Sequence, residues 1–288
     1  MYSISSNSIT VQISSKGAEL QSIYHIQNQL EYLWQAGAEW PKKSPVLFPI
    51  IGELKDKKYN YNGKEYNLSR HGFAREMEFA VKEQTKDSIT FTIHADEKTL
   101  SVYPFNFVFS VKYTITDNTL TVNYNVQNAG NDLMYFSIGG HPAFKVPIAE
   151  GTSYEDYALI FDKAETTGRW PLTSDGLVKN TPIPLLENET TLPLQKELFA
   201  ADAIVLKDLQ STAVSIKSSK TTHGLTVNFP HFPYLGIWET KGGDFVCIEP
   251  WCGIADSENA SGKLEEKEGI NELEANATFI AAFTVEFF

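Results

Sequence analysis

Hydrophobic and polar residues alternate along most of this chain, which is the period of a β-strand with one buried face. In residues 107–116 every second residue is aromatic or aliphatic, and residues 120–128 repeat the pattern after a turn. Asn62-Gly63 separates two shorter runs and fits the tight turn of a β-hairpin. Residues 279–287 alternate again at the end of the chain. These runs predict antiparallel strands.

The intervening segments are less regular. We expect short β-like pieces between prolines in residues 154–193, a single helical turn in 194–199 and a charged, loop-like stretch in 255–276. No amphipathic pattern extends over three helical turns. Many short strands separated by turn signals are typical of an all-β sandwich or barrel. Because no linker or change of composition divides residues 1–288, we expect a single domain.

Composition narrows the possible partners. Hydrophobic residues make up 42% of the chain, which is enough for a large core. The net charge of −12 argues against nucleic acid or a membrane surface as a partner, since both favour a basic face.

Two cysteines, Cys247 and Cys252, do not make a disulfide framework, and no apolar run is long enough to span a membrane. With no signal-peptide pattern at the N-terminus, we expect a cytoplasmic protein. Whether it is a monomer or a dimer stays open.

The stretch Ser137–Phe144 places His141 after two glycines and before a proline, at the end of a strand pattern. The glycines let the backbone pass where a Cβ would clash or adopt a positive φ. Pro142 restricts His141 to extended conformations, so that its ring points in one defined direction. An imidazole held in this way can move protons near neutral pH. A histidine in an ordinary turn is the alternative.

Glu249 is the most unusual carboxylate because it follows four apolar residues and precedes Pro250-Trp251. Burial would raise its pKa and make it usable as a general base. A carboxylate that points to solvent or into a salt bridge is the alternative.

Other candidate residues cluster in two segments. Arg70, His71 and Arg75 occur within six residues and could hold a carboxylate, a phosphate or a sugar hydroxyl. Asp202 begins a strand pattern and could equally cap it. A metal site built from His71, His141 and a carboxylate remains possible, although its spacing matches no known motif. No nucleotide-binding glycine loop and no nucleophile elbow is present.

Five stretches together resemble the aldose 1-epimerase (galactose mutarotase-like) superfamily, and within it the LacX-type branch. They occur in the order that is found in the family, and they are Ser44–Gly52, Arg70–Arg75, Ser137–Phe144, Phe232–Trp238 and Ile248–Asp256.

The resemblance implies a large antiparallel β-sandwich that interconverts the α and β anomers of an aldose, without a cofactor or a metal. It implies that His141 protonates the ring oxygen and that Glu249 takes the proton from the C1 hydroxyl. It also implies that His71 and Asp202 bind the sugar. Trp238, Trp251 and Phe73 could provide an apolar platform for the C–H face of the sugar, although each could equally belong to the core.

One departure from the family concerns substrate binding. Many members have an arginine shortly after the Phe-Pro-x-x-Gly segment, whereas this chain has Glu53 to Asp56 there. Arg70, Arg75 or Lys55 could replace that arginine. The alternatives to a free-hexose mutarotase are a hexose-6-phosphate mutarotase, a carbohydrate-binding or regulatory protein without turnover, and a metal-dependent enzyme of the cupin type.

Overall fold

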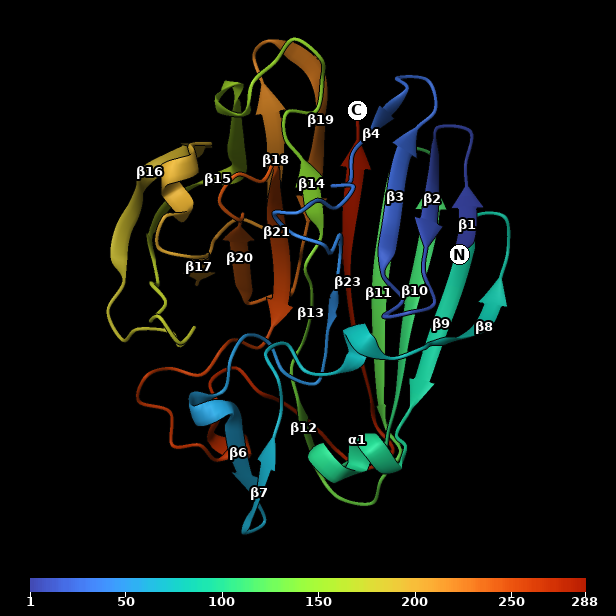
Figure 1. The fold of residues 1–288 in the computed structure, drawn as a ribbon, viewed down its shortest axis with the longest axis vertical. Coiled ribbons are helices and arrows are strands. Elements are labelled where there is room, and N and C mark those ends of the chain that lie inside the picture. Colours follow the sequence, from blue (N-terminus) through green and yellow to red (C-terminus); the bar gives the residue numbers. More distant parts are fainter.

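The computed structural model describes residues 1–288 and shows β-strands arranged in two packed layers (Figure 1). The larger layer is an antiparallel sheet of nine strands in the order β16-β15-β18-β19-β23-β11-β10-β9-β8. Its strands in chain order are β8 (Ala80–Gln84), β9 (Ser88–His94), β10 (Phe107–Thr116), β11 (Thr119–Asn128), β15 (Tyr157–Arg169), β16 (Ile183–Pro193), β18 (Ala213–Ser218), β19 (Thr221–Asn228) and β23 (Thr278–Phe287).

The second layer consists of a six-stranded and a four-stranded sheet. The six-stranded sheet has the order β17-β20-β21-β13-β5, and β14 also pairs with β21. Its strands are β5 (Val46–Leu47), β13 (Ile138–Gly140), β14 (Ala143–Lys145), β17 (Ile204–Lys207), β20 (Tyr234–Trp238) and β21 (Phe245–Cys252). The four-stranded sheet comprises β1 (Tyr2–Ser5), β2 (Ile9–Ile13), β3 (Leu20–His25) and β4 (Leu30–Glu31), drawn in blue in Figure 1.

Aromatic side chains fill the space between the layers. Phe48 follows β5 and packs against Phe107 and Phe109 of β10, with ring centroids 5.0 and 4.8 Å apart. Tyr32 packs edge-on against Phe287 of β23. The alternation of the sequence provides these contacts, because every second residue of β10 is buried. The predicted β-sandwich is therefore confirmed.

The remaining elements are short. Two small sheets pair β6 (Lys58–Tyr61) with β7 (Lys64–Asn67) and β12 (Met134–Phe136) with β22 (Asn271–Leu273). The helices are α1 (Glu97–Val102) and five 3₁₀ turns at Lys55–Lys57, Ala74–Glu76, Tyr154–Asp156, Lys196–Phe199 and Leu264–Glu266. None of these helices is long and apolar enough to cross a membrane. The hairpin at Asn62-Gly63 and the helical turn in 194–199 agree with the sequence prediction.

The expectation of short pieces in 154–193 was wrong. β15 has 13 residues and β16 has 11, and the two strands pair with several register shifts. Such irregularities interrupt the alternation that would otherwise identify a long strand. β16 also lies at the edge of the sheet and is largely exposed, so that it tolerates Pro184 and Pro193.

The sequence analysis did not predict two further short elements, which are α1 and β22. α1 is capped by Asp96, whose side chain accepts a hydrogen bond from the Thr99 N–H, but six residues are too few to show a helical period. The stretch 255–276 contains a 3₁₀ turn and β22 in addition to loops. β22 has only three residues and is recognisable only from its pairing with β12.

Candidate functional site

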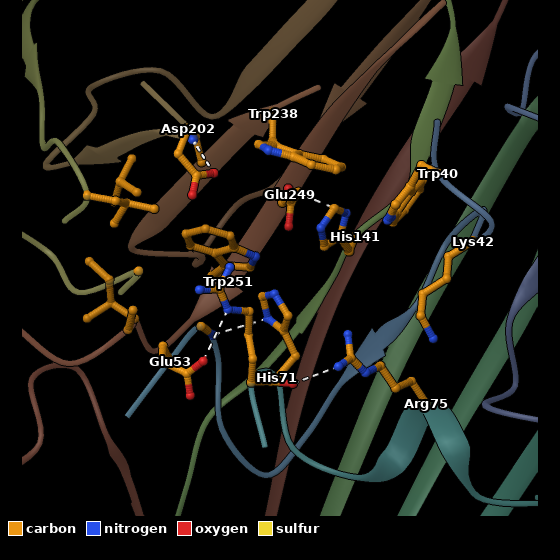
Figure 2. A pocket seen from close by; sticks show the side chains of 18 residues that line it. Trp40, Lys42, Glu53, His71, Arg75, His141, Asp202, Trp238, Glu249 and Trp251 are labelled. Atoms are coloured by element: carbon orange, nitrogen blue, oxygen red, sulfur yellow. Dashed lines mark hydrogen bonds and ion pairs between the residues drawn. The ribbon is translucent and has the colours of Figure 1, made fainter. Parts of the chain in front are cut away.

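The six-stranded sheet contributes to a pocket of about 290 Å³, which is near the lower end of the usual range for small-molecule sites (Figure 2). All seven residues predicted as site residues line this pocket. They are Arg70, His71, Arg75, His141, Asp202, Trp238 and Glu249. The fold thus brings together residues that are up to 179 positions apart in the chain.

His141 directly follows β13 and has a fixed orientation. Gly139 allows a close approach of two strands, because a Cβ there would lie 2.7 Å from the Trp251 ring. The His141 N–H donates to the Pro45 carbonyl at 3.0 Å. Its ring stacks on Trp40, with centroids 5.1 Å apart, and meets Trp238 edge-on at 5.5 Å. Aromatic contacts on two sides therefore hold the imidazole in the pocket (Figure 2).

Glu249 reaches the same place from the middle of β21. Side chains alternate along a strand, so that Cys247, Glu249 and Trp251 lie on one face. Glu249 pairs with Gly236 of β20, whose missing side chain leaves room for the Trp251 ring. Only 1% of Glu249 is exposed, and its Oε1 lies 3.4 Å from His141 Nδ1. This distance is slightly longer than a hydrogen bond.

Burial controls the protonation of this pair. It raises the pKa of Glu249 well above the usual range, and the nearby Asp202 carboxylate adds to the shift. Burial also lowers the pKa of His141 to about 3, and the charges of Arg75 and Lys42 act in the same direction. Burial therefore favours the uncharged form of both groups, which is a carboxyl that keeps its proton on Glu249 and a neutral imidazole on His141.

His71 is held by its backbone and by its ring. It adopts a left-handed φ of 66°, and its N–H donates to the Gly52 carbonyl at 2.9 Å. Its Nδ1 accepts the Gly52 N–H at 3.1 Å, which places the ring proton on Nε2. Burial, followed by the neighbouring His141 and Arg75, lowers the pKa of His71 well below its usual value. His71 is thus a neutral imidazole whose Nε2–H can donate to a ligand.

Charged side chains of opposite sign line opposite sides of the pocket. Lys42 and Arg75 lie on one side of the pocket and Asp202 on the opposite side (Figure 2). Asp202 has a φ of 73° just before β17, and its Oδ1 accepts the Ala203 N–H at 2.8 Å. Arg70 is held by Glu53, with Nε 3.3 Å from the carboxylate. Opposite charges at the two ends of the pocket would orient a polar ligand.

Among the charged and aromatic lining residues, sequence reasoning missed three, which are Trp40, Lys42 and Glu53. Trp40 and Lys42 come from a loop without a motif, and only the fold reveals their position. Two suggestions were wrong. Lys55 does not line the pocket, since its ammonium donates to the Ala260 carbonyl instead. Phe73, which the sequence also allowed as a core residue, is partly buried and packs against the core beside Phe48.

Several buried polar atoms in the protein lack a partner, and they concentrate in this pocket. Eight buried side-chain nitrogen or oxygen atoms have no hydrogen bond, and five of them belong to lining residues. These five are Glu53 Oε1, Arg75 Nε, His141 Nδ1, Glu249 Oε2 and Trp251 Nε1. Because buried polar groups are nearly always paired, this concentration indicates a binding site for a polar ligand.

Comparisons with known proteins show which family this chain resembles. A model of the aldose 1-epimerase family matches residues 1–266. The plasmid-encoded protein LacX of Lactococcus lactis is 36% identical over 277 residues, which cover 92% of each chain. A galactose mutarotase related enzyme from Lactobacillus acidophilus is 38% identical, with a TM-score of 0.95 over 100% of this chain and 97% of that chain. A galactose mutarotase-like protein from Lactobacillus casei is 31% identical, with a TM-score of 0.92 over 100% of both chains.

Replacing Gly72 with alanine should destabilise the protein more than the same change at Gly63. Both glycines have a left-handed φ, 72° and 73°. At Gly63 nothing lies within 4 Å of an added Cβ, so that the cost is the backbone strain of about 1–2 kcal/mol. At Gly72 the Cβ would also collide with the Phe48 carbonyl, and we expect a loss of about 3 kcal/mol or more. Urea unfolding of both variants measures the difference, and equal losses would contradict this account of how His71 is positioned.

Proposed function

Since the chain belongs to the aldose 1-epimerase family, we propose that it interconverts the α and β anomers of an aldose in the pocket of His141 and Glu249. The chain is an isomerase of the epimerase type that acts on sugars. The observation that supports the specific site is the 3.4 Å contact between His141 Nδ1 and Glu249 Oε1, in a pocket rich in unpaired polar atoms.

Anomer interconversion needs one proton removed from the C1 hydroxyl and one delivered to the ring oxygen. Glu249 Oε2 has no partner in the protein, so that it can take the hydroxyl proton. The proton already on Glu249 then passes from Oε1 to His141 Nδ1, after a shortening of the 3.4 Å contact on substrate binding. His141 gives its Nε2 proton to the ring oxygen. Glu249 thus acts as the base and His141 as the acid, while both stay uncharged overall.

The electron pairs follow these protons. The C1–O5 bond breaks and its electrons stay on O5, which becomes a hydroxyl. The electrons of the O1–H bond form the C1=O double bond of the open aldehyde. Rotation about C1–C2 presents the other face of the aldehyde, and the reverse transfers close the ring as the other anomer. At the end the two side chains have regained their original protons.

Other lining residues would hold the sugar during these transfers. The Nε2–H of His71 donates to a ring or hydroxyl oxygen, and Asp202 accepts from hydroxyl groups on the opposite side. Trp238 and Trp251 offer flat apolar surfaces to the C–H face of the sugar. These contacts fix the anomeric carbon beside the pair, and such positioning contributes a large part of catalysis.

Replacing Glu249 with glutamine should reduce the rate of anomer interconversion by about 10²–10⁴-fold, because the amide cannot accept the hydroxyl proton. Polarimetry of freshly dissolved α-galactose and α-glucose measures the rate. Glu239→Gln is the matched control, since Glu239 is also a buried carboxyl but pairs with Lys196 and does not line the pocket.

Equal rates for wild type and Glu249→Gln would contradict the role of Glu249. Saturable sugar binding by the wild type, with no rate enhancement on any aldose, would favour the alternative of a binding or regulatory protein.

A second candidate substrate is a hexose 6-phosphate, and the observation that favours it is the basic side of the pocket. Lys42 and Arg75 both line this side, and Arg75 Nε has no hydrogen-bond partner. Glu76 balances only part of this charge; its carboxylate lies 2.9 Å from Lys42 and 4.0 Å from Arg75. A phosphate group placed there would find two cations.

For this second candidate, Lys42→Met should raise the KM for the 6-phosphate by roughly tenfold to a hundredfold, the cost of one charged hydrogen bond, and leave the KM for the free hexose unchanged. Lys43→Met is the control, because the Lys43 ammonium donates to Gln21 and Gln35 outside the pocket. A similar effect of Lys42→Met on both sugars would exclude a phosphate-specific role.

A further inference from the structure

Cys247 lies beside the pair of His141 and Glu249, and the proposed reaction does not use it. It is two residues before Glu249 on β21, so that both side chains lie on the same face of the strand. Its exposed fraction is 0%, and it is not in a disulfide. One ligand atom each from His141, Cys247 and Glu249 lies within 4.8 Å of the other two.

Two of these side chains have lone pairs that no protein donor uses. His141 Nδ1 and Glu249 Oε2 are buried without a hydrogen-bond partner. Both residues are more than nine-tenths buried, at 8% and 1% exposed. An unpaired buried acceptor is costly, and a cation that all three side chains could reach would remove this cost.

We propose that His141, Cys247 and Glu249 form a zinc site, and that zinc bound there inhibits the enzyme. Imidazole nitrogen, thiolate sulfur and carboxylate oxygen are the three ligand types that zinc prefers. Ligand atoms of a tetrahedral zinc lie roughly 3.3–3.8 Å apart. The 3.4 Å between His141 and Glu249 already matches this spacing, and the remaining separations, which are at most 4.8 Å, need to close by no more than about 1.5 Å.

The charge balance also suits zinc. Binding releases the carboxyl proton of Glu249 and the thiol proton of Cys247 to the solvent, while His141 binds as the neutral imidazole. The two resulting negative charges cancel the two positive charges of the ion. A complex without net charge is the form that a buried site accommodates at lowest cost. Magnesium, which needs oxygen ligands in octahedral geometry, does not fit this set.

The inhibition, unlike the binding, depends on the proposed function. Zinc would occupy the Nδ1 of His141 and the carboxylate of Glu249, and these atoms pass the proton from one residue to the other. The sugar could then neither lose its hydroxyl proton to Glu249 nor gain a proton through His141. Binding itself is independent of whether the protein turns over any sugar.

Zinc titration of the full-length protein against a chromophoric chelator tests the site. We expect one zinc ion per wild-type chain, and an affinity at least about tenfold lower for Cys247→Ala because a ligand is lost. Cys252→Ala is the matched control. Cys252 is the other buried cysteine of β21, and its thiol points to the His231 carbonyl at 3.8 Å. Its removal should leave the affinity unchanged.

Cobalt(II) provides a second readout that needs no activity. Cobalt bound to a thiolate gives a sulfur-to-metal charge-transfer band in the near ultraviolet. We expect this band for the wild type and Cys252→Ala and not for Cys247→Ala. Added zinc should abolish interconversion by the wild type, and a higher zinc concentration should be needed for Cys247→Ala.

No stoichiometric binding by the wild type, or unchanged binding by Cys247→Ala, would overturn the proposal. Zinc that persists in Cys247→Ala would be held by other groups. Zinc binding that depends on Cys247 in a protein with no interconversion would support the metal site and refute only the proposed function.

Discussion

The site depends on the burial of one carboxyl group against one imidazole. Glu249 is almost completely excluded from water, and its Oε1 lies 3.4 Å from His141 Nδ1. An isolated carboxylate in this place would be very costly, and burial therefore favours the uncharged form of both groups. The consequence is a pair in which Glu249 can pass its proton to His141 while His141 gives up its own, as a reaction that moves protons between two oxygens of a sugar would require.

The sheet provides the scaffold for this pair. β13 and β21 pair in antiparallel register with Gly139 opposite Trp251, which brings residues about a hundred positions apart to the same place. Gly139 and Gly236 carry no side chain, and the Trp251 ring lies close to both. Aromatic contacts from Trp40 and Trp238 then fix the ring of His141. Strand pairing thus sets the position of the groups, and aromatic packing sets their direction.

The sequence predicted correctly those features that depend on residues close together in the chain. The alternation in residues 107–128 predicted the hairpin of β10 and β11, and the surroundings of His141 and Glu249 identified both as unusual. Burial of Glu249 follows from the apolar residues beside it. Where bulges interrupt the alternation, as in β15, the sequence pattern led to too short a predicted strand. The family resemblance, and not the spacing, suggested which residues meet in one pocket.

Contacts between distant segments could not be predicted in this way. Lys42 and Trp40 lie in a loop that has no pattern, and only the three-dimensional arrangement brings them to the pocket. The position of Cys247 beside His141 likewise requires the pairing of β21 with its neighbours. For Lys55 and Phe73 the residue type suited a role in binding, but the Lys55 ammonium donates to the Ala260 carbonyl and the Phe73 ring packs against the core.

A crystal structure of the Glu249→Gln variant soaked with an aldose tests the central claim most directly, because the variant should bind the sugar and turn it over slowly. The account predicts that the C1 hydroxyl lies within hydrogen-bond distance of residue 249, and that the ring oxygen lies within the same distance of His141 Nε2. A sugar bound with its anomeric carbon at the Asp202 end of the pocket, away from both side chains, would contradict it.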